Sequence, residues 1–83
     1  MIEAIVLLCV LPGKEQKITE EFKKIEEVKS CRQTFGEYDL ILDVYTKKVK
    51  NLGSLISKKI RHVEGITKTV TLIISDSLNN KLE

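Results

Sequence analysis

The chain has few of the residues on which several classes of protein depend. Its 83 residues include no Trp, two Phe, two Tyr, one His and two Cys. So few aromatic rings argue against a base-stacking nucleic-acid platform. One His and two distant cysteines, Cys9 and Cys31, give no metal-ligand spacing. We therefore expect neither a metal nor another cofactor, and a reduced, cytoplasmic protein is the default expectation.

The sequence also lacks a long hydrophobic run and a strong charge imbalance. The apolar segment from Ile2 to Leu11 is about half the length of a membrane span, and it lacks the basic start and small-residue cleavage site of a signal peptide. Fourteen Lys and Arg against twelve Asp and Glu give a net charge of +2, too little to indicate nucleic-acid binding. The 42% hydrophobic and 31% charged content is that of one small globular domain.

Hydrophobic periodicity predicts the element order strand, helix, strand, strand, helix, strand. The strands are predicted at residues 1–11, 28–35, 40–45 and 66–75, and the helices at residues 14–27 and 48–61. This is the α+β order of the ferredoxin-like βαββαβ fold, with an antiparallel four-stranded sheet. Right-handed crossovers place the first and third strands in the middle. Residues 1–75 form the predicted domain, and residues 76–83 form a polar C-terminal tail.

Two helices can cover only one face of such a sheet. The first strand is apolar on both faces, and we expect Ile41, Tyr45 and Ile73 to point away from the helices. Exposing about six sizeable apolar side chains would forgo roughly 9–18 kcal/mol, which rivals the whole stability of about 5–15 kcal/mol expected for a domain. We therefore predict an obligate homodimer through a two-fold, sheet-on-sheet contact that contains these three residues.

Three short motifs, in order and at these spacings, resemble one known family. They are Pro12-Gly13 after the first strand, Gly36-Glu37-Tyr38-Asp39 before the apolar third strand, and Val63-Glu64-Gly65-Ile66 before a Thr-rich last strand. From about Ala4 to Ser75 the chain resembles the RAM domain, the effector-binding domain of Lrp/AsnC-type transcriptional regulators. The resemblance implies a ferredoxin-like protomer that forms a dimeric α+β barrel, and dimers that assemble further into octamers or similar rings.

The resemblance also implies binding of a free amino acid or a similar small effector between dimers. A zwitterion needs a carboxylate near its ammonium group and N–H or hydroxyl donors near its own carboxylate. The residues that match the family's pocket are Gly36, Glu37, Tyr38 and Asp39 at the corner and Thr69 and Thr71 on the last strand. Structural roles compete with this one, because Asp39 could cap the turn and the threonines could be ordinary β-branched strand residues.

The family's full-length members differ from this sequence at the N-terminus. They carry a helix-turn-helix before the effector domain, whereas here the first strand begins within a few residues of Met1. The expectation is therefore a stand-alone effector domain without direct DNA binding. It would modulate transcription by co-assembling with full-length Lrp/AsnC regulators.

Other functions remain open from the sequence alone. An ACT-like amino-acid-binding module has the same fold and a similar ligand class. A small dimeric α+β barrel enzyme could use Asp43 or His62, although the sequence offers little for catalysis and we expect no enzyme. An RNA-binding module shares the strand order, but Phe35 and Tyr45 would be its only candidate stacking rings.

Overall fold

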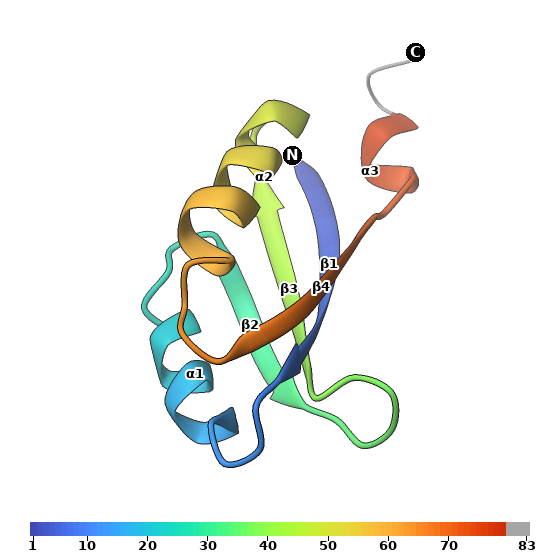
Figure 1. Ribbon diagram of the computed structural model, residues 1–83. Coiled ribbons are helices and arrows are strands. Elements are labelled where there is room, and N and C mark those ends of the chain that lie inside the picture. Colours follow the sequence, from blue (N-terminus) through green and yellow to red (C-terminus); the bar gives the residue numbers. More distant parts are fainter. Residues whose placement is uncertain (80–83) are drawn as a thin grey trace.

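The computed structural model describes residues 1–79 and confirms the predicted α+β fold (Figure 1). Its sheet has the strand order β2-β3-β1-β4, and every pair of neighbouring strands is antiparallel. The first and third strands therefore lie in the middle, as predicted. The elements are β1 (Ile2–Val10), α1 (Glu15–Phe22), β2 (Val28–Gln33), β3 (Leu40–Thr46), α2 (Val49–Leu55), the π-helical turn η1 (Ile56–Ile60), β4 (Ile66–Ile73) and α3 (Asp76–Asn79).

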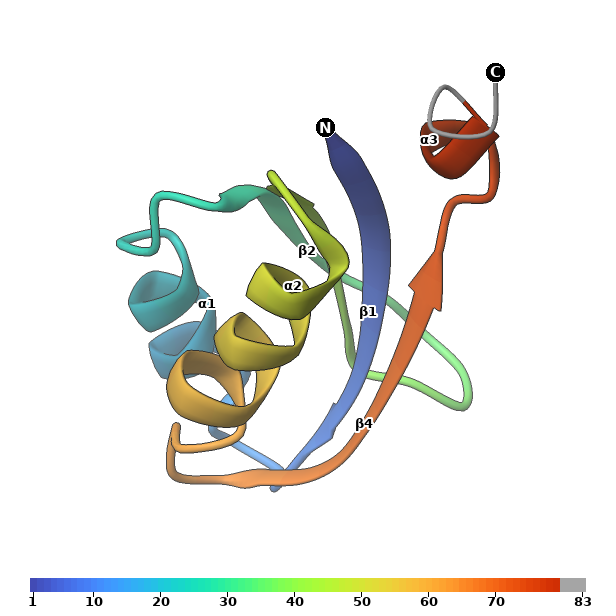
Figure 2. The ribbon, with the colours of Figure 1, turned by 90° about the horizontal axis from the view of Figure 1, so that it is seen from above.

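Helices α1 and α2 lie on the same side of the sheet, as the view from above shows (Figure 2). Every second residue of β1 is buried beneath them, because successive side chains of a strand point to opposite faces. The core on this side is completed by Ile18 and Phe22 from α1, Leu52 from α2 and Ile60 from η1. The buried residues of β1 are Ile2, Ala4, Val6, Leu8 and Val10.

Helix α1 is shorter than the sequence predicts, because it ends at Phe22 and not near residue 27. The backbone then turns, with Ile25 N donating to Phe22 O at 3.0 Å and Val28 N donating to Ile25 O at 3.1 Å. Ile25 still packs against the core, although it does so from this turn. The helix predicted at residues 14–27 was therefore placed correctly, but its predicted end was wrong, because Ile25 keeps a helix-like spacing to Ile18 and Phe22 while it packs from a turn.

The second helix changes its winding after Leu55. Residues 56–60 form one π-helical turn, and Arg61 N donates to Ile56 O at 2.9 Å. A π turn holds one residue more than an α turn, so it shifts the positions that follow. As a result Ile60, which is fully buried, faces the sheet, and Lys59 beside it is exposed.

Gly53 lies on the exposed side of α2, where it makes no close approach to the sheet. An added Cβ would meet no atom within 4 Å. Because Gly is about 0.8–1.0 kcal/mol less favourable than Ala inside a helix, we expect Gly53→Ala to raise the free energy of unfolding by up to about that amount. Urea denaturation followed by circular dichroism would measure the gain, and a decrease would contradict the placement of Gly53.

The matched control for this variant is Gly65→Ala, which we expect to destabilise the domain. Gly65 has a φ of +103°, and a Cβ there would lie 3.1 Å from Ile18 Cδ1. A side chain at this φ is strained by about 1–3 kcal/mol. The two substitutions add the same methyl group, so their opposite signs would separate helix propensity from backbone geometry.

The register of β4 corrects one expectation. Ile73 lies opposite Ala4, which is fully buried under the helices, so the two side chains share the helix-covered face. Ile73 therefore does not point away from the helices, as the sequence analysis expected. Instead Val70 and Leu72 point to the other face, because they lie opposite Leu7 and Ile5. Which side chains of a strand face the helices depends on its register with the neighbouring strand, and the sequence of β4 alone does not fix that register.

The segment predicted as a polar tail begins with α3. Ser77 binds this short helix to the sheet, because its Oγ accepts a hydrogen bond from Glu3 N at 3.1 Å and donates one to Ile74 O at 2.6 Å. Residues 80–83 of the predicted tail lie outside the described residues. None of the helices within residues 1–79 is long and apolar enough to cross a membrane.

Candidate functional site

The corner between β2 and β3 is held by backbone hydrogen bonds at its base. Thr34 N donates to Asp39 O at 2.9 Å, and Thr34 Oγ1 donates to Tyr38 O at 2.7 Å. Between them Gly36 has a φ of +119°, a conformation that L side chains rarely adopt. The corner therefore presents Gly36 and Glu37 to solvent, while Tyr38 and Asp39 are half-buried.

Asp39 joins this corner to the end of β1. Its backbone N donates to Leu8 O at 2.8 Å, and its Oδ2 accepts a hydrogen bond from Val10 N at 2.8 Å. The side chain thus continues the β1–β3 ladder beyond its last backbone pair, Leu8 with Leu40. The sequence suggested a local turn-capping role, whereas the structure shows a contact across 29 positions of the chain.

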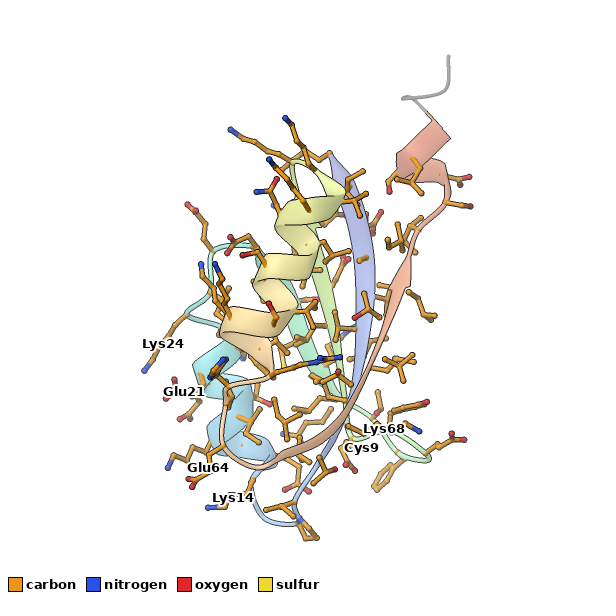
Figure 3. The ribbon with its side chains drawn as sticks, turned by 45° about the horizontal axis from the view of Figure 1, so that its top comes forward. Cys9, Lys14, Glu21, Lys24, Glu64 and Lys68 are labelled. Carbon is orange, nitrogen blue, oxygen red and sulfur yellow. The ribbon has the colours of Figure 1, made fainter. Side chains whose placement is uncertain are left out.

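Tyr38 and Glu37 reach β1 and β4 on the side of the sheet that the helices leave open. The Lys68 ammonium group lies 5.6 Å from the centroid of the Tyr38 ring, a cation–π distance. The Cys9 thiol donates to Glu37 O at 3.4 Å. Cys9 and Lys68 are cross-strand partners, and Figure 3 shows them beside the corner. The corner is therefore placed by contacts with two strands besides its own.

Next to the corner lies a hollow of about 280 Å³, here called the corner hollow. It contains carboxylates and other polar groups beside one aromatic ring, that of Phe35, which is fully exposed. These groups can accept hydrogen bonds from an ammonium group, and the Phe35 ring offers it a π face. The corner hollow is lined by Glu15, Gln33, Thr34, Phe35, Gly36 and Asp39.

Thr69 and Thr71 lie away from the corner hollow. Both share the helix-covered side of β4, because they lie opposite the buried residues Leu8 and Val6. Thr69 Oγ1 accepts a hydrogen bond from Arg61 Nε at 3.4 Å. Thr69 also lines a second hollow, of about 340 Å³, with Arg61, Ile66, Thr67 and Lys68, here called the threonine hollow. Thr71 lines neither hollow.

The sheet face opposite the helices is apolar along its centre and is here called the open face. The register places on it residues of β1, β3 and β4 that lie opposite one another. Most of them are half-buried, and Leu72 is 51% exposed. The apolar members of the open face are Ile5, Leu7, Ile41, Tyr45, Val70 and Leu72.

Acidic side chains interrupt the open face at one end. Glu3 lies opposite Tyr45, and Asp43 lies opposite Ile5. Burial, and next the neighbouring Glu3 carboxylate, raise the pKa of Asp43 above its usual value. Glu3 also raises the pKa of the Tyr45 hydroxyl. Asp43 Oδ1 is buried and has no hydrogen-bond partner among residues 1–79.

Comparison with known proteins identifies the domain. Residues 3–81 match the family model of the Lrp/AsnC ligand binding domain. The chain belongs to the Lrp/AsnC family. Its relatives include the HTH-type transcriptional regulator FL11 of Pyrococcus abyssi, which is 30% identical over 71 residues, or 86% of this chain and 46% of the relative. The chain spans about half the length of the curated relatives it matches.

Solved structures show the same Lrp/AsnC fold. The crystal structure of FFRP-DM1 aligns with a TM-score of 0.86 and 38% identity, over 89% of this chain and 99% of that one. The crystal structure of the hypothetical protein PHS023 from Pyrococcus horikoshii aligns with a TM-score of 0.85 and 38% identity, over 89% of each chain. The alignment with this domain therefore spans almost the whole chain of FFRP-DM1.

Several residues of this Lrp/AsnC domain could not be assigned to a site from their spacing. Lys68 joins the two sets of predicted residues, because it lines the threonine hollow and lies over the Tyr38 ring. Arg61 joins the threonine hollow from the end of the second helix, and Glu15 joins the corner hollow from the start of α1. The sequence signal that could have pointed to Lys68 was the presence of a basic residue within the Thr-rich last strand.

The remaining candidates lie elsewhere in the domain. Another hollow, of about 690 Å³, lies at the other end of the sheet and includes Tyr45, Lys29 and Glu27 but no residue of the corner. His62 is exposed and follows η1, whereas Asp43 belongs to the open face. Within residues 1–79, no three His, Cys, Asp or Glu side chains gather in a way that could hold a metal ion.

Proposed function

We propose that this domain is a regulatory module that self-associates through its open face and binds a free amino acid or a similar small effector at the corner. It would pass the state of this effector to Lrp/AsnC-type transcription regulators by assembling with them, without a catalytic step of its own. The observation that supports this most directly is the match of residues 3–81 to a ligand-binding domain family. Its relatives are HTH-type transcriptional regulators.

The chemistry of the corner supports an effector with both charges. Glu37 and Asp39 supply carboxylates for an ammonium group, while Arg61, Lys68 and the Thr69 hydroxyl can bind a carboxylate. Lys68 lies between these two sets of groups. The fully exposed ring of Phe35 at the tip of the corner is suited to a contact between dimers. A pocket completed there would agree with assembly into octamers or similar rings.

The open face supports self-association. Its apolar side chains would bury against the same surface of a second copy in a two-fold contact. Each of them contributes about 1.5–3 kcal/mol when it is buried completely. In this proposal Ile41 and Tyr45 stay in the interface, and Val70 and Leu72 replace Ile73 beside them.

A thermal-shift screen of the free amino acids tests the proposed effector site. A ligand at 100 times its dissociation constant stabilises a protein by about 2.7 kcal/mol, so we expect one amino acid, or a few related ones, to raise the unfolding temperature by several degrees. Glu37→Gln should weaken the apparent affinity for this amino acid at least about tenfold, and the rise in unfolding temperature should be smaller as a result. The carboxylate of Glu37 is exposed, and the hydrogen bond that Glu37 accepts from the Cys9 thiol goes to its backbone oxygen, which the Gln variant keeps.

Glu64→Gln is the matched control, because Glu64 is also an exposed carboxylate, but it lies in the connection before β4 and outside the corner of residues 36–39. It should respond to the effector as the wild type does. An unchanged unfolding temperature with every amino acid would contradict the effector site. Equal losses of apparent affinity in the Glu37→Gln and Glu64→Gln variants would indicate a general effect of charge and no specific site at the corner.

A further inference from the structure

Glu3 and Asp43 place two carboxyl groups close together at one end of the open face. Glu3 on β1 and Asp43 on β3 occupy diagonal positions of one face, because Glu3 lies opposite Tyr45 and Asp43 lies opposite Ile5. Diagonal neighbours on a strand pair are within reach of each other's side chains. A second carboxylate this close disfavours the ionisation of Asp43.

The cations near this pair offset it only in part, because Lys29 and Arg32 lower the pKa of Asp43 but burial and Glu3 outweigh them. Lys29 and Arg32 are the charged residues that β2 brings near Asp43, and Ser30 lies directly opposite it. The Lys29 ammonium group lies 5.7 Å from the centroid of the Tyr45 ring. Within residues 1–79 neither cation forms an ion pair with Asp43, and Asp43 Oδ1 is without a hydrogen-bond partner.

Among the other described elements near this end of the sheet, neither β4 nor α3 brings a positive charge to the pair. On β4 the charged residue of the open face is Lys68, which lies opposite Cys9 at the far end of β1. On α3, Asp76 is exposed. A second copy placed over the open face would therefore remove water from a carboxyl pair whose charges the described residues of its own chain offset only in part.

We propose that Glu3 and Asp43 share a proton when two copies of this chain join through their open faces, so that self-association strengthens as the pH falls. This inference rests on the proposed function, which places the second copy on this face. The pKa of Asp43 is already raised in the single chain, and covering the face would raise it further. The dimer then holds more protons than two separate chains, so acid favours the dimer and rising pH favours dissociation.

Sedimentation equilibrium of the full chain between pH 5.5 and pH 7.5 tests this proposal. Each proton released when one dimer dissociates changes the dissociation constant by up to about tenfold per pH unit, so we expect the dimer dissociation constant to be at least about 10-fold higher at pH 7.5. Asp43→Asn, whose amide is neutral and can donate to Glu3, should remove this dependence and keep tight association at pH 7.5. Glu20→Gln, on the exposed side of α1, should keep the wild-type pH profile.

The possible results of this experiment distinguish a failure of the shared-proton proposal from a failure of the proposed self-association. A wild-type dimer with the same dissociation constant across this range, or one that tightens as the pH rises, would overturn the shared proton and leave the homodimer standing. An Asp43→Asn dimer with the wild-type pH profile would overturn the role of Asp43. A folded monomer at every pH would instead contradict the proposed association through the open face.

Discussion

Leu7→Asp is expected to dissociate the proposed dimer. Leu7 lies in the middle of the open face, with Ile41 opposite it on β3 and Val70 opposite it on β4. A two-fold contact buries two copies of this side chain, and an unpaired buried carboxylate costs several kcal/mol. A loss of about 4 kcal/mol is roughly a 1,000-fold rise in the dissociation constant. Sedimentation equilibrium would measure this rise, with circular dichroism to follow folding.

Val49→Asp is the matched control for this substitution. Val49 is also an exposed apolar residue, but it begins α2 on the helix side of the sheet. A carboxylate in the first turn of a helix is favourable, so dimerisation and stability should change by no more than about 0.5 kcal/mol. A Leu7→Asp protein that remains as dimeric as the Val49→Asp protein would show that the open face is not the interface.

Asp39→Ala is expected to lose both stability and effector binding. Its Oδ2 accepts the hydrogen bond of Val10 N at 2.8 Å, and a buried donor left without its acceptor costs about 1–3 kcal/mol. In the proposed site the same carboxylate faces the ammonium group of the effector. We therefore expect a lower free energy of unfolding in urea and no rise in the unfolding temperature with the effector.

Asp39→Asn separates these two roles. An amide oxygen can still accept the Val10 hydrogen bond, but the side chain has no negative charge. The Asn variant should recover most of the stability lost in the Ala variant, while its response to the effector stays weak. An Asn variant that binds like the wild type would contradict the role of the Asp39 charge. An Ala variant as stable as the wild type would contradict the role of the Val10 contact.

The order of elements was predictable because each element has a clear local pattern. Apolar runs of strand length alternate with helical spacing, and Gly36 and Gly65 stand where positive φ values are needed. The boundaries were less predictable. Ile25 packs on the core from a turn and Ile60 from a π turn, so both satisfied the helical pattern without lying in a regular α-helix.

Contacts between distant parts of the chain could not be predicted from local patterns. Ile73 faces the helices because β4 pairs with β1 in one register, and a shift of one residue would have reversed it. For the same reason nothing in the sequence joined Lys68 to Tyr38 or Asp39 to Val10. The corner residues were grouped correctly because they are consecutive, whereas Thr69 and Thr71 were linked to them only by resemblance.

The most direct test of the central claim is the mass of the folded chain in solution. The open face is apolar and no helix of the described residues covers it, so a second copy should do so. Sedimentation equilibrium at micromolar concentration and pH 6 should give twice the 9.5 kDa chain mass or a higher multiple. A folded species of 9.5 kDa under these conditions would contradict it.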